Sequence, residues 1–243
     1  MQKGIKFRIY PNKEQQNLIN QTFGCCRLIY NKGLAMRNEA YDSGNKIGYV
    51  QTSAMLTELK KCEDFAFLKV VDSIALQQSL RDLDRGFVNF FQKRAAHPTF
   101  KSKHNKHQSY RTVNQGNNIR IAGKYIKLPK LGDIKIRQSM EVGKINNVTI
   151  QCTPTGKYFA VLNVEFEPQP SPNHGGSIGI DVGIKDFYSD SNGKVVSNPK
   201  YLEKSMRKLI REQRMLSRKQ KGSNNRNKQR VKVVLAVGTR IRR

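Results

Sequence analysis

Acidic residues are scarce in this sequence. Its 243 residues include 18 Asp and Glu against 45 Lys and Arg, which gives a formal net charge of +27 and a pI near 10.2. An excess of this size indicates a polyanionic partner, most often nucleic acid, because each phosphate that a cation neutralises releases condensed counterions. The length is sufficient for one large domain or two small ones, each with its own core.

Long apolar runs and paired cysteines are also missing. No segment approaches the apolar length of a membrane span, and no signal peptide precedes Pro11. We therefore expect a cytoplasmic, nucleoid-associated protein with no membrane partner. No C-x-x-C pair is present, which argues against a zinc ribbon and against a disulfide framework. We expect small core or surface thiols at Cys25, Cys26, Cys62 and Cys152.

The chain begins with a strand pattern that changes to a helix pattern. Residues 3–10 alternate between apolar and basic side chains, as in a half-buried strand, and Pro11 ends the run. From Lys13 to about Tyr41 the apolar residues follow helical spacing, with Gly24 as a point at which the helix could divide. A helix-turn-helix is compatible with this segment, although a helical packing unit is the simpler interpretation.

Two further helices are predicted. Thr52 or Ser53 can cap a short one that runs through Lys61, and Asp72 with Ser73 can cap a longer one. The longer helix has an apolar stripe typical of core packing, at Leu76, Leu80, Leu83, Phe87, Phe90 and Phe91. Its opposite face either touches nucleic acid or is solvated, and carries Gln78, Arg81, Asp82, Arg85 and Asn89. Residues 13–96 thus predict a helical subdomain.

Residues 92–111 contain no acidic residue. Their cations can bind phosphate, and Phe100 and Tyr110 can stack on bases, so we predict a nucleic-acid contact in preference to a solvated loop. The candidate contact residues are Lys93, Arg94, Lys101, Lys103, Lys106, Tyr110 and Arg111. Three histidines (His97, His104 and His107) could indicate a metal, but no acidic or cysteine partner is close in sequence.

From Asn118 the pattern is β again. Short runs that alternate or are rich in β-branched residues are separated by turn signals at Gly123, Gly132, Gly143 and residues 154–156. The runs are Ile119 with Ile121, residues 125–128, Ile134 with Ile136, residues 148–152 and residues 158–166. Joined to the first strand, they predict a small barrel or OB-like sheet. The prolines and glycines that follow indicate a linker at 169–176.

The stretch 177–187 carries a candidate metal ligand. Ile178, Ile180 and Val182 alternate with small or acidic residues, so we predict a core strand with Asp181 at or near its end. A carboxylate held on a strand can share Mg²⁺ with a phosphate, the geometry that phosphodiester cleavage needs. The alternative is a carboxylate that only caps the junction of strand and turn. Residues 191–194 have the form of a hairpin turn.

The last part of the chain is strongly basic. Residues 200–243 hold 16 Lys and Arg against Glu203 and Glu212, and apolar residues from Leu202 to Leu216 follow helical spacing. A charge run is often only solvated, but this density favours contact with the backbone of a duplex or heteroduplex. The candidates are Arg207, Arg211, Arg214, Arg218 and Lys219.

Several of these stretches, in this order, resemble the TnpB (OrfB) family of transposon-encoded RNA-guided DNA nucleases. Residues 179–187 resemble its first RuvC motif, and the likeness covers roughly residues 3–230. It is carried also by residues 3–12, Tyr30-Asn31 with Leu34, residues 72–91, residues 100–103 with 108–110, residues 128–132 and residues 156–158. The resemblance implies Asp181 as a catalytic Mg²⁺ ligand, and guide RNA and target DNA as partners.

The resemblance also implies the fold. We expect an α+β protein with an OB-like wedge barrel (1–11 and 104–168) interrupted by a helical recognition lobe (12–103). After the linker, residues 177–243 would begin an RNase H-like RuvC domain, with a strand edge and an apolar helix face uncovered.

The end of the sequence departs from the family. Residues 234–243 do not continue the helical register, so we expect a frameshift or truncation near Val233. The second and third RuvC carboxylates and the zinc ribbon of the family are absent, so the metal site is expected to be incomplete. The resemblance thus implies the amino-terminal portion of a TnpB-type nuclease that binds RNA and DNA. The alternatives are a nuclease-dead binder acting by occupancy and an unrelated basic RNA-binding protein.

Overall fold

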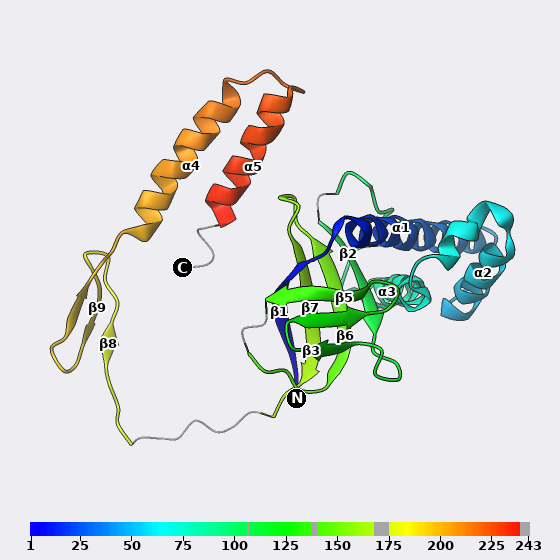
Figure 1. The fold of residues 1–243 in the computed structure, drawn as a ribbon, viewed down its shortest axis with the longest axis horizontal. Coiled ribbons are helices and arrows are strands. Elements are labelled where there is room, and N and C mark those ends of the chain that lie inside the picture. Colours follow the sequence, from blue (N-terminus) through cyan, green and yellow to red (C-terminus); the bar gives the residue numbers. More distant parts are fainter. Residues whose placement is uncertain (106, 138–139, 168–174, 239–243) are drawn as a thin grey trace. The chain divides into compact units, whose positions relative to one another are not determined.

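The computed structural model describes all residues except 106, 138–139, 168–174 and 239–243. The chain forms two compact units, Met1–Glu167 and Pro168–Arg243, called here the first and second unit. Both contain strands and helices, so the protein is α+β, as predicted (Figure 1). No helix in the described part of the chain is long and apolar enough to cross a membrane.

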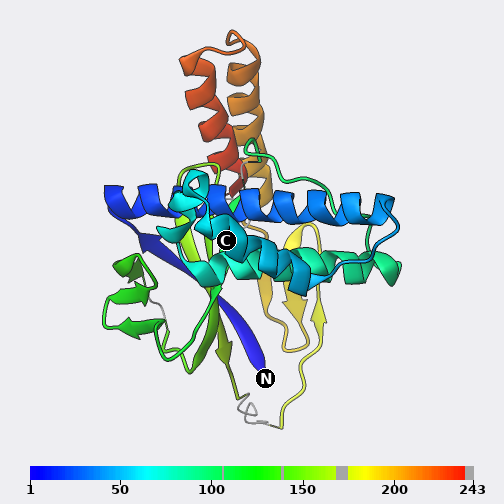
Figure 2. The ribbon, with the colours of Figure 1, turned by 90° about the vertical axis from the view of Figure 1, so that its right-hand side faces the viewer.

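The first unit is built on a curled seven-stranded sheet in the order β2-β6-β7-β1-β5-β4-β3 (Figures 1 and 2). Every neighbouring pair is antiparallel. The first strand lies in the middle, where Ile5 is opposite Leu162 and Ile9 is opposite Ile136. The strands are β1 (Gln2–Tyr10), β2 (Gln108–Val113), β3 (Arg120–Ala122), β4 (Tyr125–Leu128), β5 (Gly132–Arg137), β6 (Ile145–Cys152) and β7 (Tyr158–Glu165).

Strand β2 is the element of this sheet that the sequence prediction missed. Tyr110 and Thr112 on this strand are buried, whereas Ser109 before them is exposed and Arg111 between them is half-buried. The basic residues around this short alternation had favoured a nucleic-acid-binding loop. The other strands lie where the apolar runs predicted them, with ends shifted by a few residues.

Between β1 and β2 the chain forms α1 (Lys13–Asp42), α2 (Tyr49–Lys61), the 3₁₀ helix η1 (Glu63–Lys69) and α3 (Ser73–Phe91). Helix α1 starts with a capping box: the Gln15 amide N–H donates to Asn12 Oδ1 at 2.8 Å, and the Asn12 amide N–H donates to Gln15 Oε1 at 3.0 Å. The helix does not divide at Gly24, so residues 13–42 form one helix and not a helix-turn-helix.

The predicted cap of α2 was wrong. The helix begins at Tyr49, and the Thr52 hydroxyl lies inside it, where it donates back to the carbonyl oxygens of Gly48 and Tyr49 at 3.2 and 3.0 Å. This back-bonding satisfies the hydroxyl within the helix, so Thr52 does not serve as the cap. The predicted cap of α3 is confirmed, because Asp72 accepts from the Ile74 amide N–H at 2.9 Å.

The helices and the sheet share one hydrophobic core. Residues of α1, α2, η1 and α3 belong to the same buried cluster as the inner faces of the strands. The ring of Phe23 on α1 meets Tyr110 on β2 edge-on, with centroids 5.7 Å apart. Asp72, the cap of α3, also accepts from the buried Thr112 hydroxyl of β2 at 2.5 Å. These contacts fix β2 against both long helices.

The second unit consists of a small sheet and a pair of helices. The sheet has the order β10-β9-β8, from β8 (Ile180–Asp181), β9 (Asp186–Asp190) and β10 (Val195–Ser197). The predicted hairpin turn is confirmed: Asp190 Oδ1 accepts from the amide N–H groups of Asn192 and Lys194, and Gly193 has a φ of +81°. Helices α4 (Tyr201–Ser217) and α5 (Asn224–Gly238) lie side by side.

Helix α5 extends further toward the end of the chain than the sequence predicted. It continues through residues 234–238, which had been interpreted as leaving the helical register, and Ala236 is buried. A buried polar pair holds the two helices together: Gln229 Nε2 donates to Glu212 Oε2 at 2.7 Å and to the Glu212 carbonyl oxygen at 3.1 Å. Residues 239–243 lie outside the described residues.

Candidate nucleic-acid interface

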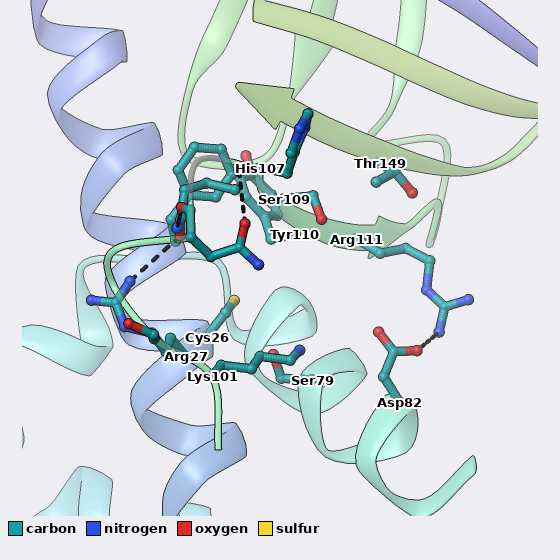
Figure 3. A pocket seen from close by; sticks show the side chains of 14 residues that line it. Cys26, Arg27, Ser79, Asp82, Lys101, His107, Ser109, Tyr110, Arg111 and Thr149 are labelled. Carbon is teal, nitrogen blue, oxygen red and sulfur yellow. Dashed lines mark hydrogen bonds and ion pairs between the residues drawn. The ribbon is translucent and has the colours of Figure 1, made fainter. Parts of the chain in front are cut away.

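A polar pocket opens in the first unit where α1 and α3 meet β2 and residues 101–105 (Figure 3). We call it the basic pocket. Its volume is about 380 Å³. Its cationic and acidic lining residues are Arg27, Asp82, Lys101 and Arg111, and the others include Cys26, Ser79, Ser102, Asn105, His107, Gln108, Ser109, Tyr110 and Thr149.

Two arginines from different elements point into the basic pocket. Arg27 projects from α1 and donates through Nη1 to Gln108 Oε1 at 3.4 Å. Arg111 projects from β2 and pairs with Asp82 of α3, with Nη2 to Oδ1 at 2.5 Å (Figure 3). The Nε of Arg111 is buried and has no hydrogen-bond partner among the described residues. Donor capacity therefore remains on this guanidinium after the ion pair is formed.

Lys101 is held by its backbone at the edge of the same pocket. Its amide N–H donates to Asn31 Oδ1 at 2.8 Å, and its carbonyl oxygen accepts from Asn31 Nδ2 at 3.0 Å. The ammonium lies over the Tyr30 ring, 3.9 Å from the centroid. Burial lowers the pKa of Lys101, an effect that Asp82 opposes. An anion in the pocket would stabilise the charged ammonium and raise that pKa.

The chemistry of the basic pocket suits a phosphate group. Three cations (Arg27, Lys101 and Arg111) line the pocket with one carboxylate, Asp82, and the serine and threonine hydroxyls add neutral donors. A doubly or singly charged oxyanion would receive charge-assisted hydrogen bonds from such a set. Lys101 and Arg111 had been predicted as nucleic-acid contacts, and the fold brings them together.

The other residues predicted in this segment lie elsewhere. Lys93, Arg94 and Lys103 are exposed outside the pocket lining. Lys106 lies outside the described residues. The prediction that Tyr110 stacks on a base was wrong. Its side chain is only 7% exposed and packs against Phe23. Burial raises its pKa above the usual range. A ring this buried cannot stack on a base without leaving the core.

Sequence reasoning missed several lining residues of the basic pocket. Arg27 lay within a helix interpreted only as a packing unit, and Asp82 was assigned to a face that touches nucleic acid or is solvated. No sequence signal could have joined them, because the pocket arises where α1 and α3 pack against the unpredicted strand β2.

A second cationic surface lies on α4 in the second unit. Four arginines recur at intervals of four, three and four residues and line one shallow groove with Ile210 and Met215: Arg207, Arg211, Arg214 and Arg218. We call this surface the arginine face. From first to last it spans about 16 Å, given a rise of 1.5 Å per residue. One strand of a nucleic acid places about five phosphates along that distance.

The arginines on this face differ in their ion pairs. Arg207 pairs with Glu203, and Arg211 Nη2 lies 3.6 Å from Glu212 Oε1. Arg214 and Arg218 have no acidic partner within ion-pair distance among the described residues. The predicted Lys219 follows the end of α4, where its carbonyl oxygen accepts from Arg226 Nη1 at 2.7 Å. Lys219 does not line the groove.

Asp181 does not lie on the predicted core strand. Strand β8 has two residues, and Asp181 lies opposite Ser189 of β9 with its side chain exposed. The apolar residues around it are exposed as well, at 52% for Ile178, 58% for Ile180 and 73% for Val182. No other described element buries this strand, which is why the predicted core position was wrong.

The carboxylates near Asp181 do not by themselves fit a Mg²⁺ site. Asp190 is occupied by the hairpin turn, where its Oδ1 accepts two amide N–H groups. In the part of the chain that the structure describes, no three His, Cys, Asp or Glu side chains lie close enough to share a metal ion. Hydrolysis with metal ions needs several converging ligands, and the described residues around Asp181 do not supply them.

Comparison with known proteins places the chain in a family. Residues 1–46 match the helix-turn-helix domain of OrfB from IS605-type elements, and residues 161–243 match the OrfB family described as "Probable transposase". A Streptomyces pristinaespiralis protein named "Putative RNA-guided DNA endonuclease" is 38% identical over 96% of this chain. The chain belongs to the TnpB/OrfB family.

Two further proteins are similar to this member of TnpB/OrfB. The Escherichia coli K12 protein named "Putative RNA-guided DNA endonuclease InsQ" is 37% identical over 95% of this chain. "Virulence protein VsdF" of Salmonella dublin is 36% identical over 44% of this chain and 98% of its own length. The chain spans 59% and 58% of the length of the Streptomyces and E. coli relatives.

Proposed function

We propose that this chain binds RNA and DNA as the amino-terminal portion of an RNA-guided DNA endonuclease. The observation that carries the proposal is the 38% identity, over almost the whole chain, to a relative with that printed name. On this proposal the curled sheet corresponds to the family's wedge barrel and α1 to α3 correspond to its recognition lobe. The second unit would correspond to the beginning of its RuvC domain.

The charges of both units support nucleic-acid binding. The basic pocket offers cations from α1, from β2 and from the loop that holds Lys101, and the arginine face offers a row along one helix. Groups arranged in these ways bind phosphates without reading base sequence, so we expect binding to depend on salt and little on sequence. The proposed partners are guide RNA and target DNA.

The isolation of Asp181 favours a second candidate, binding by occupancy without cleavage. Asp181 is exposed on a two-residue strand, and no metal-binding cluster surrounds it in the described ranges. On this second proposal the chain covers RNA or DNA through the basic pocket and the arginine face. Asp181 would contribute at most one ligand to a Mg²⁺ site.

The experiment that tests the first proposal measures the affinity of the full chain for labelled single-stranded RNA and duplex DNA by fluorescence anisotropy. The test variant carries Arg207→Gln, Arg214→Gln and Arg218→Gln. The control loses the same charge from exposed lysines of the first unit, through Lys13→Gln, Lys61→Gln and Lys69→Gln. We expect the test variant to bind at least about tenfold more weakly than the control at low salt.

One outcome would count against each proposal. Equal weakening by both triple variants would mean that net charge, and not the arginine face, governs binding. Cleavage of a DNA substrate by the purified chain with Mg²⁺, abolished by Asp181→Asn, would refute binding by occupancy alone and support the endonuclease.

A further inference from the structure

A second pocket, lined by aromatic rings, lies at the carboxyl-terminal ends of α1 and α3. These helices run side by side (Figure 2), and Arg37 Nη1 of α1 pairs with Asp84 Oδ1 of α3 at 2.8 Å just before the pocket. Its volume is about 470 Å³. We call it the aromatic pocket and define it by Tyr41, Phe87, Phe90, Phe91 and His97.

Several rings of the aromatic pocket contact one another, and two present an exposed face. Phe87 is buried and is stacked near Phe91, with centroids 6.2 Å apart. His97 meets Phe87 and Phe90 edge-on, with centroids 5.3 and 5.2 Å apart. By contrast, Phe91 is 66% exposed and Tyr41 is 70% exposed. Two large rings therefore present area that a flat ligand could cover.

The charge around the aromatic pocket indicates what that ligand is. Lys46 lines the pocket together with Asp42, and Lys93 and Arg94 follow directly after α3 with exposed side chains. The turn that holds these last two is fixed by the Arg94 amide N–H, which donates to the Asn89 carbonyl oxygen at 2.8 Å. Aromatic rings beside cations are the arrangement that binds single-stranded nucleic acid, the bases stacking and the phosphates pairing.

We propose that the aromatic pocket accepts an unpaired base of a single strand, whose phosphates lie against Lys46, Lys93 and Arg94. The proposal rests on the proposed function, since the base belongs to a bound RNA or DNA strand. The positive rim favours this occupant over an apolar peptide, which carries no phosphate to pair with the cations. Arg37 also lines the pocket, with its guanidinium 4.1 Å from the Phe87 centroid.

The test compares strands with and without bases. The full chain is titrated by fluorescence anisotropy with labelled oligothymidylate, with oligouridylate and with an abasic oligomer of equal length. The variants are Phe91→Ala, Tyr41→Ala and, as a conservative control, Phe91→Tyr. Phe67→Ala removes an exposed ring of η1 that is outside the pocket, as a matched control. Thermal unfolding checks that each variant folds, which we expect because the mutated rings are exposed.

The proposal predicts that Phe91→Ala weakens binding of the base-containing strands at least about fivefold and leaves the abasic strand unchanged. Phe91→Tyr and Phe67→Ala should bind like the parent. The difference between oligouridylate and oligothymidylate tells whether RNA or DNA supplies the base. If the parent binds all three strands equally, or Phe91→Ala binds them as the parent does, the inference is overturned and the proposed function stands.

Three other outcomes would each overturn the inference. If no strand binds, the proposed function and this inference fall together. If Phe91→Ala leaves every affinity unchanged but abolishes a concentration-dependent dimer in sedimentation, the pocket is a contact between two copies. If it abolishes only the binding of an apolar peptide, the occupant is a protein. Both of these results would overturn the inference.

Discussion

Gly33 sets the distance between α1 and α3, and replacing it by alanine should destabilise the first unit. A Cβ at this position would lie 2.9 Å from Leu80 Cδ2 and 3.1 Å from Leu83 Cδ2. Both leucines are buried on α3, so neither methyl group has open space to enter. Overpacking of this kind costs about 1–3 kcal/mol.

Gly24 provides the matched control on the same helix. A Cβ there would have no heavy atom within 4 Å, apart from the helix itself and its chain neighbours. Replacing a glycine inside a helix by alanine gains about 0.5–1 kcal/mol, and this gain applies at both positions. We therefore expect Gly24→Ala to stabilise the unit. For Gly33→Ala this gain offsets part of the overpacking cost, so the free energy of unfolding of the first unit should fall by up to about 2 kcal/mol.

Urea unfolding followed by circular dichroism measures the difference. The sequence contains no tryptophan, so far-ultraviolet ellipticity and tyrosine fluorescence are the natural signals. We expect the two variants to differ by about 1–3 kcal/mol, which corresponds to roughly 2–12 °C in Tm for a domain of this size. If Gly33→Ala stabilises as much as Gly24→Ala, the close contact of α1 with α3 is refuted, and so is the geometry of both pockets between them.

Three further predictions concern other elements. Lys93 has a left-handed backbone (φ +58°), so Lys93→Gly should raise the free energy of unfolding by up to about 1 kcal/mol in thermal melts, whereas Lys93→Ala should not. Burial raises the pKa of Cys26 from 9.0 to about 12, and also raises that of Tyr110. The folded state thus keeps protons that the unfolded state loses, and urea titrations should show stability falling above pH 9. Cys26→Ala should make the fall of the free energy of unfolding with pH less steep, by about 1.4 kcal/mol per pH unit. Gln229→Glu would place a second carboxylate beside the buried Glu212, so helicity of the second unit should fall at pH 7 and recover in acid; unchanged helicity would contradict the pairing.

Elements with one unambiguous period were predictable from the sequence. Alternation of Ile5, Phe7 and Ile9 predicted β1, and the stripe from Leu76 to Phe87 predicted α3, since each pattern buries one face. The helical spacing of the apolar residues from Leu202 to Leu216 likewise predicted α4. In these cases local spacing alone determines which side chains share a surface.

Features that depend on distant packing were not predictable. Tyr110 has the same identity whether it stacks on a base or fills the core, and only the position of β2 beside α1 shows that it fills the core. The basic pocket needs Arg27, Lys101 and Arg111 together, although they come from separate elements. For Asp181 the alternating residues predicted a strand, but burial depends on neighbours, and none among the described elements covers it.

The salt dependence of binding tests the central claim, that the cations of this chain bind a nucleic-acid backbone. The affinity of the full chain for labelled oligouridylate is measured over a series of salt concentrations. If the arginine face and the basic pocket together neutralise at least about four phosphates, the logarithm of the affinity should fall with a slope near −3 or steeper against the logarithm of salt concentration. The variant with Arg207→Gln, Arg214→Gln and Arg218→Gln should lose about two units of that slope. An affinity that does not change with salt, or a slope equal in the variant and the parent, would contradict the account.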